Sequence, residues 1–250
     1  MRPTAQIQWR SDPAFTRVTW GRRELVIHRE LAERAEVLIG TLGKLAGETG
    51  AGNRGSAFRV NLAGGLEIFA RRARRGGLIR FFLSDIYVGT NPRPLRELAV
   101  TIEARRRGIA VAEPLGAMVE WVGPALLPIV YRGFFLTRAI AGMTLWEFVQ
   151  TDDDPIVRSH VLRQAHAAID TMHSKGLFHA DLNLHNLMVT KSGESFAVII
   201  LDLDKSRLMD TAVPPGMRRA NAARLIRSCR KLDAAGKYFD AEALSLLIRG

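Results

Sequence analysis

The sequence contains little cysteine and no long run of apolar residues. Cys229 is the only cysteine in 250 residues, which excludes an internal disulfide framework and favours a reducing compartment. No apolar segment approaches the roughly 18 residues of a membrane-spanning helix. The N-terminal stretch MRPTAQIQWRSDP lacks the apolar core of a signal peptide. These absences favour a globular protein with neither a membrane span nor a leader.

Acidic residues are also in the minority. Lys and Arg number 36 against 25 Asp and Glu, for a formal net charge of +11. A basic surface suits nucleic acid, an anionic lipid surface or an acidic substrate, and charge alone does not choose among them. The apolar content of 47% is typical of a globular chain, and its length suits one large domain or two small lobes.

The most informative stretch is HADLNLHN, from His179 to Asn186. Its spacing matches H-x-D-L-x-x-x-N, the catalytic loop of protein kinases. Phosphoryl transfer needs a carboxylate to accept or orient the attacking hydroxyl, which is the role predicted for Asp181. It also needs side-chain oxygen for Mg²⁺ near the phosphates, which is the role predicted for Asn186.

A second carboxylate follows at the expected place. Asp202 comes after the apolar run Ala197–Leu201, and the turn KSGE separates this run from an earlier apolar segment. The pattern predicts a β-hairpin with Asn186 at one end and Asp202, a second Mg²⁺ ligand, at the other. A surface hairpin with unrelated polar residues is the alternative. Two motifs in the right order favour the kinase interpretation.

The segment GETGAGNRGSAFRVNL contains a glycine pattern upstream of this loop. Gly50, Gly52 and Gly55 match G-x-G-x-x-G and would let backbone N–H groups approach the phosphates of ATP. Taken alone, the pattern also fits a surface turn. Its position before a kinase-type catalytic loop favours nucleotide binding.

A kinase also needs a cation on its third strand, paired with a glutamate on a helix. No Lys occurs in LEIFARRARRGGLIR, where two strands flank a basic turn, so Arg71 is the predicted cation. Arg72, Arg74 and Arg75 are predicted to lie in a solvated turn, with contact to an acidic substrate or a membrane as the alternative. Glu97, in a helix predicted over 92–107, is the candidate partner, although its place near the helix start would also favour the helix dipole.

Other elements follow from local signals. Strands are predicted around Gly116–Val122 and Ile129–Thr137, and Thr137 and Ala139 would lie in a hinge whose backbone faces adenine. Thr144 and Glu147 form a capping box, and Asp154-Pro155 begins a long helix. Helices are also predicted for three further segments: Leu31–Leu45, the basic amphipathic run Asn221–Leu232 and Ala241–Ile248.

The predicted fold class is α+β, a protein-kinase-like two-lobed fold. Residues 1–138 would form an N-lobe with an antiparallel sheet, an αC-type helix and the nucleotide site. Residues 139–250 would form a reduced, mainly helical C-lobe with the catalytic loop and metal site, the two lobes making one kinase-like domain. Only 48 residues follow Asp202 in the 250-residue chain, without an A-P-E sequence, so the usual peptide-docking subdomain is not expected.

Five short motifs are spread along the chain: R-R-x-R-R-G-G at Arg71–Gly77, R-E-L at Arg96–Leu98, H-A-D-L-N-x-x-N at His179–Asn186, D-L-D-K at Asp202–Lys205 and N-x-A-R-L-x-R-S at Asn221–Ser228. On these motifs the chain resembles the 3-deoxy-D-manno-octulosonic acid (Kdo) kinases of the lipopolysaccharide kinase superfamily of Gram-negative bacteria, over roughly residues 50 to 235. Leu203 stands where that family has Phe, a departure that affects packing more than metal binding.

The resemblance implies an activity and a location. It implies ATP- and Mg²⁺-dependent phosphorylation of the 4-hydroxyl of Kdo on a Kdo-lipid A precursor. It also implies a peripheral protein at the cytoplasmic face of the inner membrane, bound to its anionic surface, with no nucleic-acid partner. A heptose kinase, another small-molecule or protein kinase such as an aminoglycoside-type phosphotransferase, and a non-catalytic pseudokinase stay open as alternatives.

Overall fold

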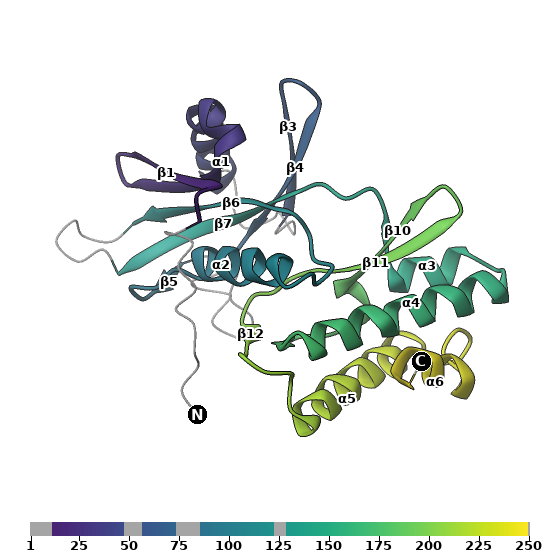
Figure 1. The fold of residues 1–250 in the computed structure, drawn as a ribbon. Coiled ribbons are helices and arrows are strands. Elements are labelled where there is room, and N and C mark those ends of the chain that lie inside the picture. The colour runs from purple at the N-terminus through teal and green to yellow at the C-terminus, as the bar shows by residue number, and fades with distance from the viewer. Residues whose placement is uncertain (1–11, 48–56, 74–85, 123–128, 250) are drawn as a thin grey trace. The chain divides into compact units, whose positions relative to one another are not determined.

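The computed structural model describes residues 12–47, 57–73, 86–122 and 129–249. Two compact units make up the chain. Ile7–Ile102 and Glu113–Ala139 belong to the first, which is called the sheet unit here. Glu103–Ala112 and Ile140–Gly250 belong to the second, which is called the helical unit. Figure 1 labels the helices and strands of both units, and each unit is described by itself.

The sheet unit is built on a seven-stranded antiparallel sheet in the order β1-β2-β6-β7-β4-β3, with β5 also pairing with β7. Alternating burial in β4 follows the period of two expected for a strand. The strands are β1 (Phe15–Trp20), β2 (Arg23–His28), β3 (Ala57–Leu62), β4 (Leu66–Arg72), β5 (Tyr87–Val88), β6 (Pro114–Trp121) and β7 (Val130–Arg138).

Two helices cover opposite faces of this sheet, as Figure 1 shows. α1 (Ala35–Gly47) packs on the face that carries Met118 and Phe134. α2 (Arg93–Arg106) packs on the other face, where the side chains of the intervening strand positions lie. The alternation of neighbouring residues between two apolar clusters explains why the central strands are buried on both sides.

The first fifty residues differ from the prediction. A helix was expected over Leu31–Leu45, but Arg29–Arg34 form a 3-10 helix and α1 begins only at Ala35. The hairpin β1–β2 was not predicted at all. Four consecutive residues of β2 are buried, so the strand lacks the alternation that marks a half-exposed strand in a sequence.

The helical unit confirms several local predictions. Thr144 and Glu147 form the capping box at the start of α3 (Leu145–Thr151). The Asp154 side chain caps α4 (Pro155–Ser174), with Pro155 in its first turn. β10 (Leu187–Ser192) and β11 (Ser195–Ile200) form the predicted hairpin, and β8 (Met143–Thr144) adds a third strand to it.

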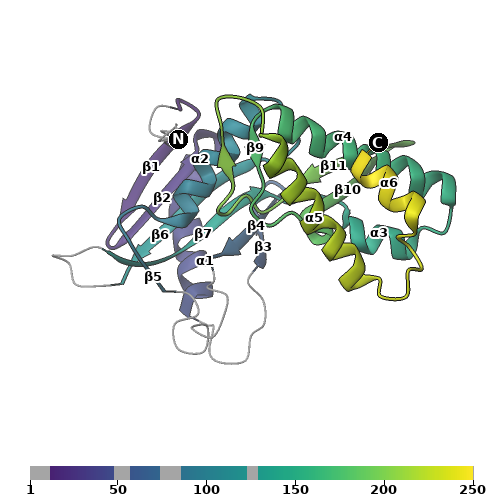
Figure 2. The same ribbon diagram turned by 90° about the horizontal axis from the view of Figure 1, so that it is seen from below.

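Two helices end the described chain. α5 (Pro215–Leu232) begins six residues before its predicted start at Asn221, and α6 (Ala241–Arg249) follows it. α4 packs against both β11 and α6, and Figure 2 shows α5 running alongside α4. A two-stranded ribbon, β9 (Leu177–Phe178) with β12 (Arg207–Leu208), completes the unit.

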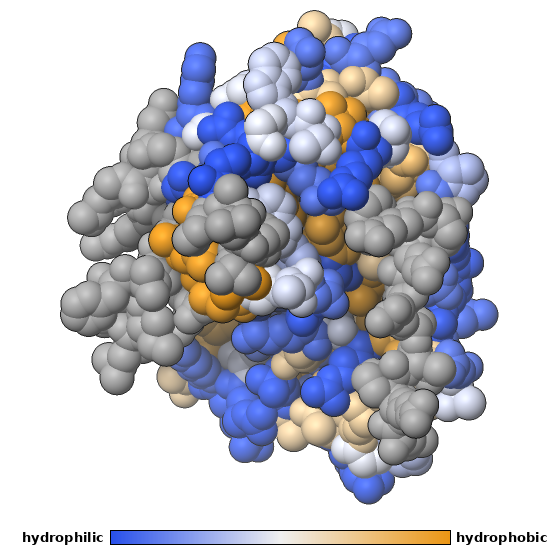
Figure 3. Space-filling view, turned by 90° about the vertical axis from the view of Figure 1, so that its left-hand side faces the viewer, coloured by the Kyte–Doolittle hydropathy of each residue, from blue (hydrophilic) through white to orange (hydrophobic). Residues whose placement is uncertain are grey.

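The surface is mostly hydrophilic on the face drawn in Figure 3, with smaller hydrophobic areas between the polar residues. Among the helices that the structure describes, none combines the length and the apolar character needed to cross a membrane.

Candidate active site

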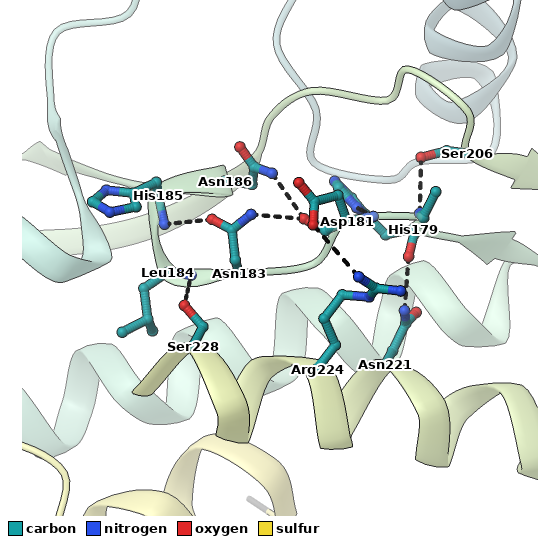
Figure 4. Close-up of polar contacts among 11 residues, drawn as sticks. His179, Asp181, Asn183, Leu184, His185, Asn186, Ser206, Asn221, Arg224 and Ser228 are labelled. Atoms are coloured by element: carbon teal, nitrogen blue, oxygen red, sulfur yellow. Dashed lines mark hydrogen bonds and ion pairs between the residues drawn. The ribbon is translucent and has the colours of Figure 1, made fainter. Parts of the chain in front are cut away.

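In the loop after β9, hydrogen bonds to the backbone of Asp181 hold this residue in place. The side-chain amides of Asn183 and Asn186 both donate to the Asp181 carbonyl oxygen, at 2.9 and 2.8 Å. The Asn183 side-chain oxygen accepts from the His185 N–H, which caps the short 3-10 helix η4 (Leu184–Asn186). The Asp181 side chain takes no part in these loop contacts and is 67% exposed. Its carboxylate is therefore presented to an incoming group (Figure 4).

His179 joins this loop to the hairpin. Its side chain is fully buried. Nδ1 accepts from the Asp181 N–H at 3.0 Å, and Nε2 lies 2.8 Å from the Leu201 carbonyl oxygen. Because Nδ1 accepts, the single proton of a neutral ring sits on Nε2 and donates to Leu201. Burial lowers the pKa of His179 and so favours this neutral form.

Asp202 follows directly on this contact. The Leu201 N–H donates to the Asn186 carbonyl oxygen at 2.9 Å. One predicted metal ligand, Asn186, thus accepts this backbone hydrogen bond, and the other, Asp202, directly follows the donor. Asp202 has a φ of 56°, a left-handed conformation that Asp tolerates better than most residues. Such strained positions persist where the surrounding structure holds them, and they cluster at functional sites. The next residue, Leu203, is buried.

The donor chemistry of Asn186 and Asp202 suits Mg²⁺. Both offer hard oxygen ligands. The Asn186 amide nitrogen donates to the Asp181 carbonyl oxygen, so the amide oxygen of Asn186 points away from Asp181. In the described chain, no group of three or more His, Cys, Asp or Glu side chains is arranged to hold a metal ion. Two protein ligands are nevertheless enough for Mg²⁺, which usually keeps water and takes phosphate oxygens from its nucleotide.

Helix α5 packs against the loop and makes hydrogen bonds to its backbone. The Asn221 amide nitrogen donates to the His179 carbonyl oxygen at 2.7 Å, and its oxygen lies 2.9 Å from Nε2 of the buried His173. Ser228 Oγ accepts from the Leu184 N–H at 3.3 Å. The lone Cys229 is also buried here, and burial raises its pKa to about 12. Its thiol stays protonated at neutral pH, so it serves in packing and not as a nucleophile.

The structure adds one residue to the site that the sequence prediction missed. Arg224, on the same helix, places Nη1 3.6 Å from Asp181 Oδ1 (Figure 4). Asn221, Arg224 and Ser228 are spaced at i, i+3 and i+7, which puts them on one face of a helix. This spacing is visible in the sequence, but only the fold shows that the face meets the catalytic loop.

In the sheet unit, Arg71 on β4 and Glu97 on α2 form the ion pair that the sequence predicted. Arg71 Nη2 lies 2.5 Å from both carboxylate oxygens. Glu97 is only 5% exposed and Arg71 23%, so the pair is largely shielded from water. Its role in nucleotide binding stays a prediction.

The neighbouring Arg72 corrects the prediction of a solvated turn. It is the last residue of β4 and is 2% exposed, with its guanidinium 5.9 Å from the centre of the Phe134 ring. The period of a strand turns alternate side chains to opposite faces, so Arg71 and Arg72 point apart and only Arg71 faces α2. Arg74 and Arg75 lie outside the described residues.

Of the other residues predicted to contact the nucleotide, the structure describes Thr137 and Ala139. Gly50, Gly52 and Gly55 lie outside the described residues. Thr137 is buried and pairs across both β4 and β6. The Ala139 N–H already donates to the Glu67 carbonyl oxygen at 2.9 Å, so a contact with adenine at Ala139 would use the carbonyl oxygen of this residue.

Arg71→Ala is expected to raise the KM for ATP and to lower kcat by roughly 10²-fold, because the cation predicted to bind the phosphates is lost. Arg71→Lys should recover part of the loss, since a lysine restores the charge without the guanidinium geometry. Steady-state kinetics with varied ATP measure both effects. Arg59→Ala is the control, since Arg59 makes an exposed pair with Glu67 on the same sheet. Unchanged kinetics in Arg71→Ala would exclude the role.

Comparisons with known proteins show the family of the chain. Residues 44–244 match the lipopolysaccharide kinase (Kdo/WaaP) family. A 3-deoxy-D-manno-octulosonic acid kinase of Xylella fastidiosa (strain M23) is 31% identical over 194 residues, which cover 76% of this chain and 72% of the relative. Another from Stenotrophomonas maltophilia (strain K279a) is 27% identical over 216 residues, covering 83% and 80%.

The fold has a counterpart among solved structures. A structure described as WaaP in complex with acyl carrier protein aligns with a TM-score of 0.53 at 16% identity, covering 90% of this chain and 89% of that one. Together with the family match, the α+β, protein-kinase-like fold and the kinase-type loop define the chain as a kinase. The chain belongs to the lipopolysaccharide kinase (Kdo/WaaP) family.

Proposed function

We propose that the protein transfers a phosphoryl group from ATP to the 4-hydroxyl of Kdo on a Kdo-lipid A precursor. The observation that carries the proposal is the loop geometry, in which Asp181 is held by its backbone and its carboxylate points outward. The relatives named as Kdo kinases support the choice of acceptor.

Asp181 would accept the proton of the acceptor hydroxyl, or orient that hydroxyl, at its exposed carboxylate. Asn186 and Asp202 would hold Mg²⁺, which when bound neutralises charge on the phosphates. His179 would fix the position of Asp181 relative to Asp202, since it contacts the Asp181 N–H and the carbonyl oxygen of the residue just before Asp202.

Arg71 would bind phosphate oxygens of ATP. The Glu97 carboxylate fixes the guanidinium through both of its oxygens, so less side-chain freedom is lost when ATP binds. Gly50, Gly52, Gly55, Thr137 and Ala139 complete the proposed nucleotide site. Nucleotide binding by residues 1–138 and catalysis by residues 139–250 are parts of the same proposal.

Mass spectrometry of the acceptor tests the function. Purified protein, ATP and Mg²⁺ are incubated with a Kdo-lipid A precursor or, separately, with a heptose-bearing acceptor. Gain of one phosphate by Kdo, mapped to the 4-hydroxyl, is the expected result. Transfer to heptose alone would favour the heptose kinase alternative. Binding of ATP without transfer to any acceptor would favour the pseudokinase.

The proposed acceptor belongs to a bilayer, so we also propose peripheral binding to the anionic cytoplasmic face of the inner membrane. On α5, Arg219, Arg230 and Lys231 are exposed. Not every basic residue is available to such a surface, since Arg72 is buried and Arg218 pairs with Asp170 at 3.1 Å.

We expect the protein to co-sediment with anionic vesicles at low salt and to dissociate as salt is raised. Each basic residue near the surface contributes about 1 kcal/mol, and salt screens this attraction. Arg219→Gln combined with Arg230→Gln should therefore lower the affinity by roughly thirtyfold. Neutral vesicles are the control. Equal binding to both vesicle types, or binding to neither at low salt, would contradict electrostatic docking and leave the kinase proposal intact.

A further inference from the structure

Arg224 lies between two anchored residues on the face of α5 that meets the catalytic loop. Asn221 on one side bonds to the His179 carbonyl oxygen, and Ser228 on the other accepts from the Leu184 N–H. These contacts hold the helix backbone against the loop without any help from Arg224. The position of the Arg224 guanidinium beside Asp181 is thus set by the helix on which it sits (Figure 4).

The Arg224–Asp181 pair contributes little to the fold. The two side chains are 43% and 67% exposed, and exposed ion pairs are weak because water and salt screen them. The buried residues Asn221, Leu225 and Cys229 already dock the helix. An ion pair that adds little stability can be exchanged for contacts with a ligand at low cost.

The guanidinium has the chemistry for such an exchange. It carries five N–H donors in a planar fork and keeps its charge at any physiological pH. That fork matches the two oxygens of a carboxylate. Asp181 is where the acceptor hydroxyl is proposed to bind, so a second acceptor group at Arg224 would have to be an anion close to that hydroxyl.

We propose that Arg224 binds the carboxylate of an acidic sugar and so selects the acceptor; this rests on the proposed function. When the acceptor enters, the acceptor hydroxyl binds the Asp181 carboxylate, and the carboxylate of the acceptor binds the Arg224 guanidinium. The internal ion pair is replaced by two contacts with the substrate. The site then distinguishes acidic from neutral sugars, because a neutral sugar would separate the pair without offering an anion to Arg224 in return.

Kinetics with matched acceptors test this selection. Wild type, Arg224→Lys, Arg224→Gln and Arg163→Gln are compared in neutral detergent micelles, on a Kdo-lipid A precursor and on its Kdo methyl ester. Arg163 is exposed on α4 and controls for the loss of one positive charge. Arg224→Gln should raise the KM for the acid by about 10- to 100-fold, the loss expected for a charge-assisted contact, and leave the KM for ATP unchanged.

The ester comparison separates recognition from a general loss of activity. Wild type and Arg163→Gln should prefer the acid, Arg224→Gln should treat acid and ester alike, and Arg224→Lys should regain part of the preference. If Arg224→Gln lowered only kcat, or still preferred the acid, the inference would be overturned.

A direct binding measurement keeps the inference separate from the proposed function. Calorimetric titration with a deacylated Kdo oligosaccharide requires no turnover. Binding by wild type and Arg163→Gln that is lost in Arg224→Gln supports the inference even if no phosphate is transferred. Equal binding by wild type and Arg224→Gln, or no binding by wild type, overturns the inference whatever the outcome of the transfer assay.

Discussion

Asp181→Ala is expected to lower phosphoryl transfer by about 10³-fold or more while leaving the affinity for Mg²⁺·ATP close to that of the wild type. The carboxylate would be needed only at the acceptor hydroxyl. The loop should keep its shape, because Asn183 and Asn186 bond to the Asp181 backbone oxygen and not to its side chain. Steady-state transfer and equilibrium binding of a fluorescent ATP analogue measure the two effects separately.

Asp210→Ala is the control for this variant, since Asp210 is exposed in the same unit and has no proposed role. It should behave as wild type in both measurements. Turnover at the wild-type rate by Asp181→Ala would remove Asp181 from the reaction. Loss of ATP binding together with transfer would mean that the residue serves the nucleotide and not the acceptor.

Substitution of Asp202 is expected to weaken both metal-nucleotide binding and transfer, the latter again by about 10³-fold, because a charged ligand of Mg²⁺ is removed. Asp202→Asn is the cleaner test. Asparagine tolerates the left-handed conformation at φ 56°, whereas alanine at this position adds backbone strain to the loss of charge. Both variants should require more Mg²⁺ for half-maximal activity than wild type.

Titration of Mg²⁺ at fixed ATP measures this requirement, with Asp210→Asn as the matched control. An Asp202→Asn variant with wild-type Mg²⁺ dependence and turnover would contradict the metal assignment. Thermal unfolding of each variant shows whether the fold is kept, so that loss of activity through unfolding is recognised.

Local signals in the sequence were enough for much of the helical unit. The capping box at Thr144, the Asp154 cap and the hairpin between Asn186 and Asp202 depend on residues only a few positions apart. Such interactions form between neighbours in the chain, so spacing alone predicts them. The kinase-type loop motif belongs to the same class, since Asp181 and Asn186 are five positions apart.

The pair of Arg71 and Glu97 is an intermediate case. The residues are 26 positions apart, and the sequence indicated them only through the order of motifs in a kinase. The sequence prediction chose Arg71, and the sheet supplies the physical reason for that choice over Arg72. β4 turns Arg71 toward α2 and Arg72 toward the opposite face, over the Phe134 ring.

The sequence by itself determined the loop with the kinase-type motif, the hairpin between Asn186 and Asp202 and the capped helices, because each is held by contacts between near neighbours. Only the tertiary structure decided the burial of Arg72, the β1–β2 hairpin and the placement of Arg224 at Asp181. The last of these joins residues 43 positions apart, and it depends on the packing of α5 against the loop through Asn221 and Ser228. Contacts of this kind arise from the packing of whole elements, and no local pattern encodes their partners.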